Sequence, residues 1–359
     1  MIRRLDLTLY DWPLALTTLG LNAVGLFALA SAAPNPQLWK MQLVWTALAL
    51  VSAALLQLLR KDTLYRWAPW LYLGVLALLV GVLFLGREVN GARAWFVLGP
   101  LRLQPSELAK LALILVLARY LHTRPLASWR DYLVPLALAA PPILLTAVEP
   151  DLGGALVMVA IVAGIFFVRG LPLRHLLLAG ALVAVLVPTV IWPNLKPYQQ
   201  ERVLVVLNPA RDPLGAGFQV IQSMIAIGSG GLAGKGYGQG TQAQLGFIPE
   251  RQTDFIFSVW AEEMGFVGAL AVLLAYAVLF YRLGVMAMEV LQGGDRLLIA
   301  GVLSFLAFQV LVNVGVTLGV APVTGITLPL LSYGGTSLLT TYLALGLAQL
   351  VYRDRYEPV

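Results

Sequence analysis

Ten long apolar runs constrain this sequence more than any other feature. A helix needs about 20 predominantly apolar residues to cross about 30 Å of hydrocarbon. The chain has 359 residues, of which 59% are hydrophobic and only 12% are charged, about half the charge of an ordinary soluble domain. We therefore expect an all-α polytopic membrane protein with ten transmembrane helices, near residues 12–31, 38–58, 66–86, 105–122, 131–149, 152–168, 174–192, 255–281, 296–318 and 327–351.

The positions of Lys and Arg predict how these spans are oriented. With the N-terminus inside, the cytoplasmic segments hold Arg3, Arg4, Arg60, Lys61, Arg66, Arg119, Arg124, Arg130, Arg169, Arg174, Arg282, Arg296, Arg353 and Arg355, whereas the short outer loops hold only Lys40, Arg87, Arg93 and Arg102. Cytoplasmic loops are enriched in Lys and Arg, so we expect both termini in the cytoplasm. The net charge of +6 then reflects membrane orientation, and we expect no nucleic acid partner.

The two ends of the first span imitate a cleavable signal peptide, with Arg3 and Arg4 before it and ALASAA (28–33) at its end. Its apolar run is too long for a typical signal peptide, so a retained signal anchor is expected. The chain has no cysteine, which excludes disulfides, thiolate nucleophiles and Cys-ligated metal sites.

A single membrane domain over residues 1–359 is the simplest organisation, since no fixed-period repeat is visible. A large extracytoplasmic loop, residues 193–254, separates spans seven and eight and is long enough to be functional. Its middle, FQVIQSMIAIGSGGL (218–232), is long enough for a short interfacial or re-entrant helix but not for a span.

The acidic residues are distributed unevenly about the predicted membrane. Of 18 Asp and Glu residues, those on or toward the outer side are Glu88, Glu107, Glu149, Asp151, Glu201, Asp212, Glu250, Asp254, Glu262 and Glu263. Orientation depends mainly on Lys and Arg, so topology does not require this bias. A charge inside a bilayer costs about 2.5 to 3.5 kcal/mol and normally faces a cavity or a partner. The bias therefore indicates chemistry at the outer face.

The stretch FIPERQTDFIFSVWAEE (247–263) carries four of these acids. Thr253 or Asp254 could cap the eighth helix, which typically adds about 1 kcal/mol, but a cap needs only one acid. At a rise of 1.5 Å per residue, Glu262 and Glu263 should lie about 12 Å deeper than Asp254. We expect them to face a polar cavity or cationic partners, and neutralisation of basic residues on neighbouring spans is the alternative.

Two further motifs place charges at outer span ends. In SELAK (106–110), Glu107 and Lys110 are three residues apart on one helical face. They can be a self-neutralising pair that lowers the cost of insertion, a functional pair that lines an outer cavity, or both. EPDLGG (149–154) brings Asp151 to a tight outer turn, where a simple polar turn is the alternative to a site.

The glycine-rich stretch GSGGLAGKGYGQG (228–240) does not match a nucleotide-binding loop. Its backbone N–H groups and Lys235 could approach a phosphate, and hinge flexibility is the alternative. Other cations of the outer side are Lys196, Arg202, Arg211, Arg251, Arg87, Arg93 and Arg102. Acids and cations on one face suit a substrate with a phosphate and a hydroxyl to be deprotonated, although surface ion pairing is generally commoner. We assign no role to His122 and His175.

Four motifs in order carry a resemblance to a known family. They are GREVNGARAWFVLGPLRLQPSELAK (86–110), EPDLGGALV (149–157), the stretch from Tyr198 to Gly268 that includes FIPERQTDFIFSVWAEE, and GVAPVTGITLPLLSYGGTSLL (319–339). Together they closely resemble the shape, elongation, division and sporulation (SEDS) family of bacterial proteins. The motif FIPERQTDFIFSVWAEE is more similar to the elongation branch of the family than to the division branch.

The resemblance implies a ten-span glycosyltransferase that polymerises lipid II, the undecaprenyl-diphosphate-linked disaccharide pentapeptide, at the outer face of the cytoplasmic membrane during elongation and shape maintenance. It also implies a class B penicillin-binding protein as partner. The essential aspartate of the family corresponds to Asp254, and the Glu and Lys of its outer cavity correspond to Glu107 and Lys110. We expect the substrate cavity to use Glu107, Lys110, Asp151, Arg202, Gln219, Ser223, Lys235, Glu250, Thr253, Glu262 and Ser332.

This chemistry needs one base. Diphosphate leaves as a stable anion and requires charge neutralisation, unlike the alcohol that a glycosidase must protonate. We therefore expect Asp254 to deprotonate the incoming sugar 4-hydroxyl, while Lys and Arg residues or a divalent cation (Mg or Mn), with Asp254 as a candidate ligand, stabilise the diphosphate. No organic cofactor is expected. A lipid II flippase is the competing function, and a non-enzymatic scaffold is a third.

Overall fold

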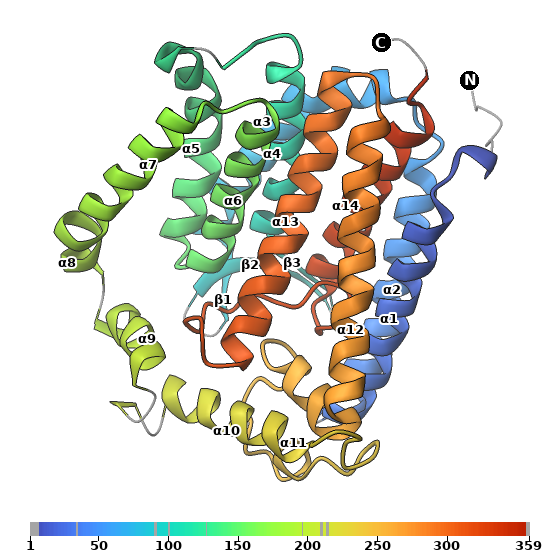
Figure 1. Cartoon of the computed structure of the whole chain (residues 1–359), viewed down its shortest axis with the longest axis vertical. Helices are drawn as coiled ribbons and strands as arrows, with labels where there is room; N and C mark the ends of the chain where they lie inside the picture. Colours follow the sequence, from blue (N-terminus) through green and yellow to red (C-terminus); the bar gives the residue numbers. More distant parts are fainter. Residues whose placement is uncertain are drawn as a thin grey trace.

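The computed structural model describes residues 7–33, 35–89, 92–99, 101–126, 128–195, 197–208, 211–212 and 215–356. Long helices stand side by side and make most of the molecule (Figure 1). They are α1 (Trp12–Ala32), α2 (Pro36–Leu56), α3 (Lys61–Leu85), α4 (Pro105–Leu121), α5 (Leu133–Val148), α6 (Leu152–Val168), α7 (Leu173–Leu186), α12 (Ile256–Glu289), α13 (Gly293–Thr317) and α14 (Gly335–Arg353).

Each of the predicted apolar runs overlaps one of these helices. Among the described residues, six helical segments are long and apolar enough to cross a membrane: Trp12–Ala32, Pro36–Leu56, Lys61–Leu85, Trp129–Val148, Ile256–Glu289 and Gly293–Thr317. The last run was predicted to be helical from residue 327, but α14 begins only at Gly335. Residues 319–334 instead form an irregular segment that packs inside the bundle.

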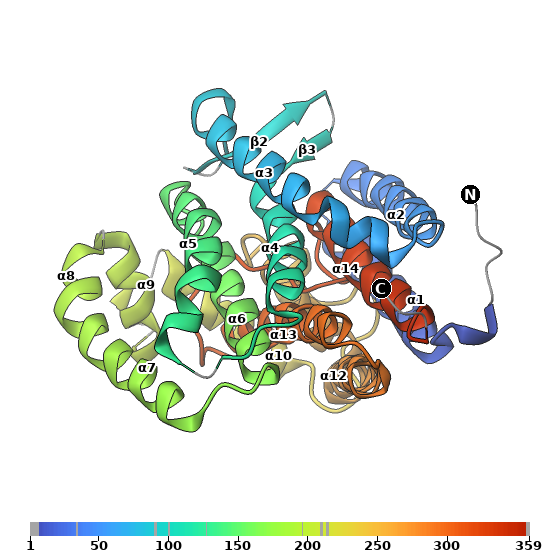
Figure 2. The same cartoon turned by 90° about the horizontal axis from the view of Figure 1, so that it is seen from above.

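The expectation of an all-α fold was wrong in one place. Between α3 and α4 the chain forms a small antiparallel sheet of β1 (Arg87–Val89), β2 (Ala92–Leu98) and β3 (Leu101–Leu103), in the order β1-β2-β3. Trp95 pairs with Arg87, and Phe96 pairs with Leu103. Figure 2 shows the sheet at the edge of the bundle beside α3. The sheet lies in the predicted outer loop between the third and fourth spans, for which no strand was predicted.

The bundle packs around α4, which contacts α3, α5, α6 and α13. Leu113, Ile114 and Leu117 have no exposed surface. Burying a Leu or Ile side chain contributes about 1.5 to 3 kcal/mol in water, but between lipid-embedded helices close packing replaces that term. The centre of α4 is therefore a buried apolar layer between the two ends of this helix.

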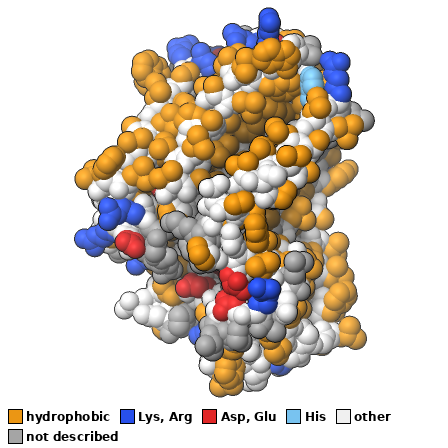
Figure 3. Space-filling model, turned by 90° about the vertical axis from the view of Figure 1, so that its left-hand side faces the viewer, with side chains coloured by type: hydrophobic (Ala, Val, Ile, Leu, Met, Phe, Trp, Pro, Cys, Tyr) orange, Lys and Arg blue, Asp and Glu red, His pale blue; other side chains and the backbone are white. Residues whose placement is uncertain are grey.

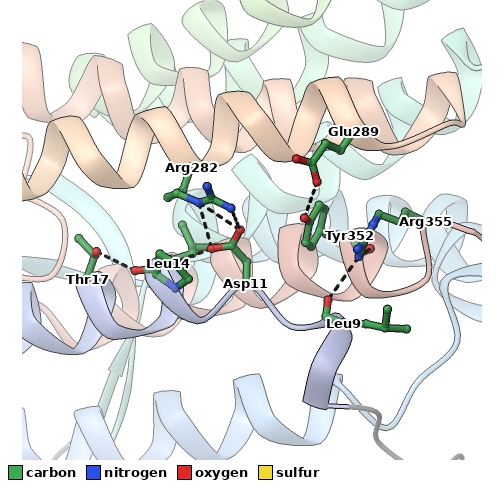
Figure 4. A network of polar contacts seen from close by, with 9 residues as sticks. Leu9, Asp11, Leu14, Thr17, Arg282, Glu289, Tyr352 and Arg355 are labelled. Atoms are coloured by element: carbon green, nitrogen blue, oxygen red, sulfur yellow. Dashed lines mark hydrogen bonds and ion pairs between the residues drawn. The ribbon is translucent and has the colours of Figure 1, made fainter.

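Both ends of the described chain lie at one end of the bundle, called here the termini end (Figure 1). Polar contacts join α1, α12 and α14 there (Figure 4). Asp11 caps α1 by accepting a hydrogen bond from the Leu14 N–H at 2.9 Å and forms an ion pair with Arg282 at 2.5 Å. Tyr352 donates to Glu289 at 2.5 Å. These contacts hold the first and last long helices to α12.

The opposite end, called here the cavity end, carries the short elements. These are η3 (Val187–Ile191), α8 (Trp192–Asn194), α9 (Pro197–Leu207), α10 (Ala216–Ser229) and α11 (Thr241–Gln244), with η1 (Leu7–Leu9) and η2 (Trp129–Tyr132) at the termini end. In Figures 1 and 2, α7, α8 and α9 lead away from the other long helices, and Figure 1 shows α10 returning beneath them. The predicted short helix within 218–232 is present as α10, and its placement in a membrane stays a prediction.

Helix α12 is broken at Gly265, where φ is 67° and ψ is −166°. The glycine-rich loop closes against this break. The backbone N–H groups of Lys235 and Gly236 donate to the carbonyls of Glu262 and Glu263 at 3.1 and 3.0 Å, and the Phe266 N–H donates to the Gly231 carbonyl at 2.8 Å. Residues 256–264 therefore form a short separate helix before the long part of α12.

Candidate active-site cavity

A cavity of about 680 Å³ opens at the cavity end of the bundle. Residues from α2, α4, α6, α10, α13, β2, β3, the first turn of α14 and the two irregular segments 250–254 and 323–334 line it. Seven of the predicted site residues are among them: Glu107, Lys110, Asp151, Gln219, Glu250, Thr253 and Asp254. Motifs separated by up to 150 positions in the sequence thus meet at one place. On the face drawn in Figure 3, Asp and Glu side chains gather in the lower half.

Glu107 and Lys110 form a buried ion pair on α4. Lys110 Nζ lies 2.7 Å from Glu107 Oε1, and only 1% of the lysine side chain is exposed. The ammonium also lies 5.1 Å from the centre of the Phe305 ring, close enough for a cation–π contact. The charges neutralise each other, as one reading of SELAK predicted, and both residues also line the cavity. The pair is therefore both self-neutralising and cavity-lining, and its part in function stays a prediction.

Asp151 joins two elements at the cavity wall. It is the N-cap residue of α6, and its Oδ1 accepts from the Gly154 N–H at 2.7 Å. Its Oδ2 accepts from Gln104 Nε2 and Ser106 Oγ, both at 3.1 Å, so it also ties α6 to the start of α4. The prediction of a simple polar turn at EPDLGG therefore accounts for part of the role of Asp151, because these three contacts involve protein groups alone.

Glu149, in the same turn, is buried beside the cavity without lining it. It is 1% exposed, and neither carboxylate oxygen has a hydrogen-bond partner among the described residues. Burial, and next the negative charge of Asp151, raise the pKa of Glu149 to about 8. This carboxyl is therefore largely protonated at neutral pH.

Asp254 lies in a tight turn that the rest of the bundle holds by its backbone. Glu250 has a positive φ of 51°, and its carbonyl accepts from the N–H groups of Thr253 and Asp254 at 3.1 Å. Helix α12 begins at Ile256 with Phe255 as its N-cap residue. The alternative that Thr253 or Asp254 caps this helix was therefore wrong. The Asp254 side chain borders the cavity instead.

Two distant side chains hold the peptide groups around Asp254. Ser332 donates to the Thr253 carbonyl at 2.5 Å, and Asn313 donates to the Asp254 carbonyl at 3.0 Å. Ser332 itself accepts from the Leu328 N–H at 2.8 Å. Ser332, which the sequence proposed as a cavity residue, thus acts through the backbone beside Asp254 and does not line the cavity.

Three other predicted site residues lie outside the cavity. Ser223 shares a hydrogen bond with Ser258 at 2.6 Å and donates to the Thr317 carbonyl at 2.7 Å, which ties α10 to α12 and α13. Lys235 and Glu262 pair with each other at 2.7 Å. The side chain of Arg202 lies outside the described part of the structure, as does all of Lys196.

Glu262 and Glu263 are at the rim, and the expectation that they lie deeper than Asp254 was wrong. Glu263 accepts a hydrogen bond from Ser31, in the last turn of α1 at the cavity end. Gln42 lies about 9 Å along α2 from the first residue of that helix, and its side chain donates to the Ser332 carbonyl. Because the Ser332 hydroxyl donates to the Thr253 carbonyl, the turn that contains Asp254 is the deeper of the two. The break at Gly265 is the reason, because residues 256–264 are not the start of a continuous membrane-crossing helix.

Glu262 has the cationic partner that its burial requires. Besides Lys235, it accepts from the N–H groups of Gln242 and Ala243 at 3.0 and 3.2 Å and from the Thr241 hydroxyl at 3.2 Å. The carboxylate therefore fastens the start of α11 and the glycine-rich loop to the short helix 256–264. This is a structural role at the edge of the site.

Several amide side chains of the site were missed by sequence reasoning. Gln104 holds Asp151, Asn313 holds Asp254 and the Ile326 carbonyl, and Gln309 lines the cavity. Gln309 and Asn313 are four residues apart in the apolar run of α13 and both are buried. Polar side chains inside a span usually face the bundle, and that spacing was the signal.

Comparison with known proteins identifies the fold and the family. Residues 15–357 match the family model of FtsW, RodA and SpoVE, described as cell cycle proteins. The chain belongs to the FtsW/RodA/SpoVE family. The match covers nearly the whole chain and confirms the resemblance inferred from the motifs. This FtsW/RodA/SpoVE protein is accordingly a multi-pass membrane protein.

Its relatives are similar over most of their length. Peptidoglycan glycosyltransferase MrdB of Escherichia coli K12 is 41% identical over 290 residues, which cover 80% of this chain and 78% of MrdB. The solved structure of the rod shape determining protein RodA of Thermus thermophilus is 44% identical, with a TM-score of 0.76 and coverage of 97% of this chain and 98% of that one. A chain solved within a peptidoglycan synthase complex that coordinates polymerization and crosslinking is 52% identical, with a TM-score of 0.87 and coverage of 97% and 99%.

Proposed function

We propose that this chain is a peptidoglycan glycosyltransferase that polymerises lipid II at the outer face of the bacterial cytoplasmic membrane during cell elongation and shape maintenance. One observation carries the proposal: Asp254, Glu107 and Lys110, which come from distant motifs, line a single cavity of about 680 Å³. A cavity of this size suits a small substrate or the head of a larger one. The name of MrdB, a peptidoglycan glycosyltransferase, supports the same reaction class, and the name of the Thermus thermophilus protein supports a part in determining cell shape.

Asp254 is proposed as the general base. It takes the proton from the 4-hydroxyl of the acceptor sugar, whose oxygen then forms a bond to C1 of the donor sugar while the bond from C1 to the diphosphate oxygen breaks. The diphosphate leaves as an anion, and C1 is inverted. The turn 250–254 is held by Ser332 and Asn313 through the carbonyls of Thr253 and Asp254, which keeps the base in place.

Positive charge for the leaving diphosphate is available in the same cavity. Arg102 and Lys110 both line it, and the charge of Lys110 is shared with its ion-pair partner Glu107. A divalent cation would add to this charge, but the cavity offers only part of a metal-ligand set. The described residues contain no group of three or more Asp, Glu or His side chains that could hold a metal ion. Mg²⁺ commonly uses one or two carboxylates together with substrate phosphates, so Asp254 and Glu250 would be its protein ligands here.

The proposed orientation places the termini end in the cytoplasm and the cavity outside. The Lys and Arg excess predicts this arrangement. All ten long helices would then be membrane spans, with residues 193–254 as the extracytoplasmic loop. A class B penicillin-binding protein is the proposed partner, since the 52% identical chain belongs to a peptidoglycan synthase complex. Membrane lipids surround the exposed apolar helix faces.

The apolar layer in α4 favours an enzyme over a lipid II flippase. A translocation path needs polar groups across the membrane, whereas every residue from Leu111 to Ala118 in α4 is apolar and buried. Below Lys110, the helix at the centre of the bundle therefore offers no polar group until Arg119.

The test is polymerisation of purified lipid II by the full-length protein with its class B partner. Asp254→Asn should abolish glycan chains while the variant still folds and binds the partner. Glu201→Gln is the matched control, because it removes an outer carboxylate that pairs with Arg211 and does not line the cavity. Equal polymerisation by Asp254→Asn and wild type would overturn the proposed base. Translocation of lipid II across vesicles without polymerisation would favour the flippase.

A further inference from the structure

A second cavity, of about 470 Å³, lies at the termini end of the bundle. Side chains from the first turns of α3, the last turns of α4 and the start of α13 line it. It is separate from the active-site cavity, since Lys110 and Arg119 are nine positions apart on α4, about 13.5 Å along the helix, with the apolar layer between them. The proposed glycosyl transfer does not use it.

Two arginines without carboxylate partners face this cavity. Arg66 makes no ion pair or hydrogen bond with any described residue, and Arg119 has one hydrogen bond, from Nη1 to the Tyr65 carbonyl. A guanidinium has five N–H donors arranged as a fork that matches phosphate or carboxylate oxygens. Most of the donor capacity of these two side chains is therefore directed to groups outside the described protein.

Both acids near this cavity have cationic partners. Asp62 lines the cavity and pairs through Oδ2 with Arg60 at 3.0 Å, whereas its Oδ1 has no hydrogen-bond partner among the described residues. Behind the wall, Asp295 is fully buried, pairs with Lys61 at 3.1 Å and accepts from the Tyr65 hydroxyl at 2.8 Å. The local charge that remains is therefore that of Arg66 and Arg119, and it is positive.

Neutral donors add to this charge. His122 Nδ1 accepts a hydrogen bond from the Gly294 N–H at 3.1 Å, which assigns the proton of the neutral ring to Nε2 and makes that nitrogen a donor. Helices α3 and α13 both begin at this cavity, with Lys61 and Gly293 as first residues. Their amino-terminal dipole ends favour an anion, in addition to the arginines.

The position of the cavity indicates where its ligand comes from. Trp67 and Trp70 follow Arg66 on α3 and are 56% and 67% exposed. Exposed tryptophans near a span end are typical of the headgroup level of a membrane. Leu71 and Leu73 continue this exposed apolar face toward the middle of the bilayer, where an acyl chain could lie. Figure 3 shows Lys and Arg gathered along the same end of the molecule.

We propose that this cavity is a phosphate-binding site on the cytoplasmic side, filled by the headgroup of an anionic phospholipid of the inner leaflet. Arg66 and Arg119 bind the phosphate oxygens, and His122 Nε2 donates to the same headgroup. Basic pockets between helices at the cytoplasmic surface are a recurring site for anionic lipids. A soluble phosphate has the same chemistry, so the experiment separates the two sources.

The experiment uses the full-length protein in detergent with titrated short-chain phosphatidylglycerol, phosphatidylcholine or inorganic phosphate at constant ionic strength, and reads binding by native mass spectrometry and Tm. Wild type should bind phosphatidylglycerol and not phosphatidylcholine. Arg66→Gln and Arg119→Gln should each weaken that binding about tenfold, as expected for one charge-assisted contact. Arg66→Lys, which keeps the charge, should retain most of it.

Arg130→Gln is the matched control, because Arg130 is an exposed arginine of the same end that stacks on Trp129 and does not line the cavity. It should bind like wild type. Binding of inorganic phosphate with the same losses would support the site and assign it to soluble phosphate. Equal binding of phosphatidylglycerol and phosphatidylcholine, or an equal loss in Arg130→Gln, would overturn the proposal.

Discussion

The hydroxyl of Ser332 lies 2.5 Å from the carbonyl oxygen of Thr253 and donates a hydrogen bond to it. The two residues are 79 positions apart in the sequence. Through this bond, the irregular segment before α14 holds the peptide group immediately before Asp254. Tyr333 strengthens the contact, because its N–H donates to the Gln252 carbonyl at 2.8 Å.

Ser332→Ala should lower the kcat of polymerisation by about ten- to hundredfold with little change in KM for lipid II, because a small misplacement of a catalytic group has effects of this size. The cost in folding free energy should be about 1 to 3 kcal/mol, because the hydroxyl makes two hydrogen bonds and each typically contributes about 0.5 to 1.5 kcal/mol. Steady-state lipid II polymerisation and thermal unfolding of the same preparation measure the two effects.

Ser304→Ala is the control for this substitution. Ser304 donates to the Ala300 carbonyl within its own helix at 2.8 Å and touches no part of the cavity. It should leave kcat unchanged. A normal kcat in Ser332→Ala would show that the Ser332 hydrogen bond does not position Asp254.

A single and a double variant should separate the structural contribution of the buried Glu107–Lys110 pair from its contribution to activity. Lys110→Met leaves Glu107 buried without its partner and should destabilise the fold by about 3 to 5 kcal/mol. The double variant Glu107→Gln with Lys110→Met removes both charges and should recover most of that stability. It should remain inactive in polymerisation, because the cavity has lost its buried cation.

Lys61 and Asp295 provide a matched pair for comparison, since they are equally buried and 3.1 Å apart but lie away from the cavity. Lys61→Met with Asp295→Asn should keep polymerisation activity. If the Glu107/Lys110 double variant also kept it, the pair would be only a device for inserting α4.

The long helices could be predicted from the sequence because length and hydropathy determine which segments can cross a membrane. The break in α12 at Gly265 could not be predicted in this way, because an apolar run indicates burial in lipid but says nothing of backbone dihedral angles. Residues 255–281 therefore read as one span, and Glu262 and Glu263 were placed at the wrong depth. The small sheet was missed for a different reason, because its strands of 3, 7 and 3 residues lie between two predicted spans and are too short to stand out as apolar runs.

The site was partly predictable because charges in an apolar chain are costly and stand out. Asp254, Glu107, Lys110 and Asp151 were found in this way, and the structure places them around one cavity. Ser332 and Asn313 act on backbone carbonyls far away in the sequence, and nothing in the local sequence reveals such a partner. Only the packing of the irregular segment against residues 250–254 does so.

Gly265→Ala should open the contact between the glycine-rich loop and α12. A Cβ at residue 265 would lie 2.3 Å from the Gly234 nitrogen and 2.6 Å from the Leu232 oxygen, at a φ of +67° that disfavours any side chain. Strain of about 1 to 2 kcal/mol and overpacking of about 1 to 3 kcal/mol should add. Faster hydrogen exchange or proteolysis of residues 230–245 would report the opening.

Gly284→Ala, in the same helix, is the control, because nothing lies within 4 Å of a Cβ at that position. It should be neutral or slightly stabilising, as Ala is the better helix former. Unchanged protection of the loop in Gly265→Ala would contradict the view that the break and the loop form one unit.

Glu149 predicts a pH dependence of stability. Its pKa is raised from 4.5 to about 8, by burial first and then by Asp151. Between these two pH values the folded protein binds more protons than the unfolded chain. The contribution of Glu149 to the free energy of unfolding is therefore fully present below pH 4.5 and is lost as the pH rises toward 8. The direction is opposite to that of a salt-bridged carboxylate.

Glu149→Gln should remove this loss, because glutamine keeps the shape of the neutral acid and cannot ionise. Its Tm should match that of wild type at about pH 5 and exceed it by a few degrees at about pH 8, with a flatter profile between them. Thermal unfolding across this range measures the effect, and Glu88→Gln, which removes an exposed carboxylate of the same side, should follow the wild-type profile. Parallel profiles for wild type and Glu149→Gln would mean that Glu149 is ionised in the folded protein, and a cation near the EPDLGG turn would then have to be sought.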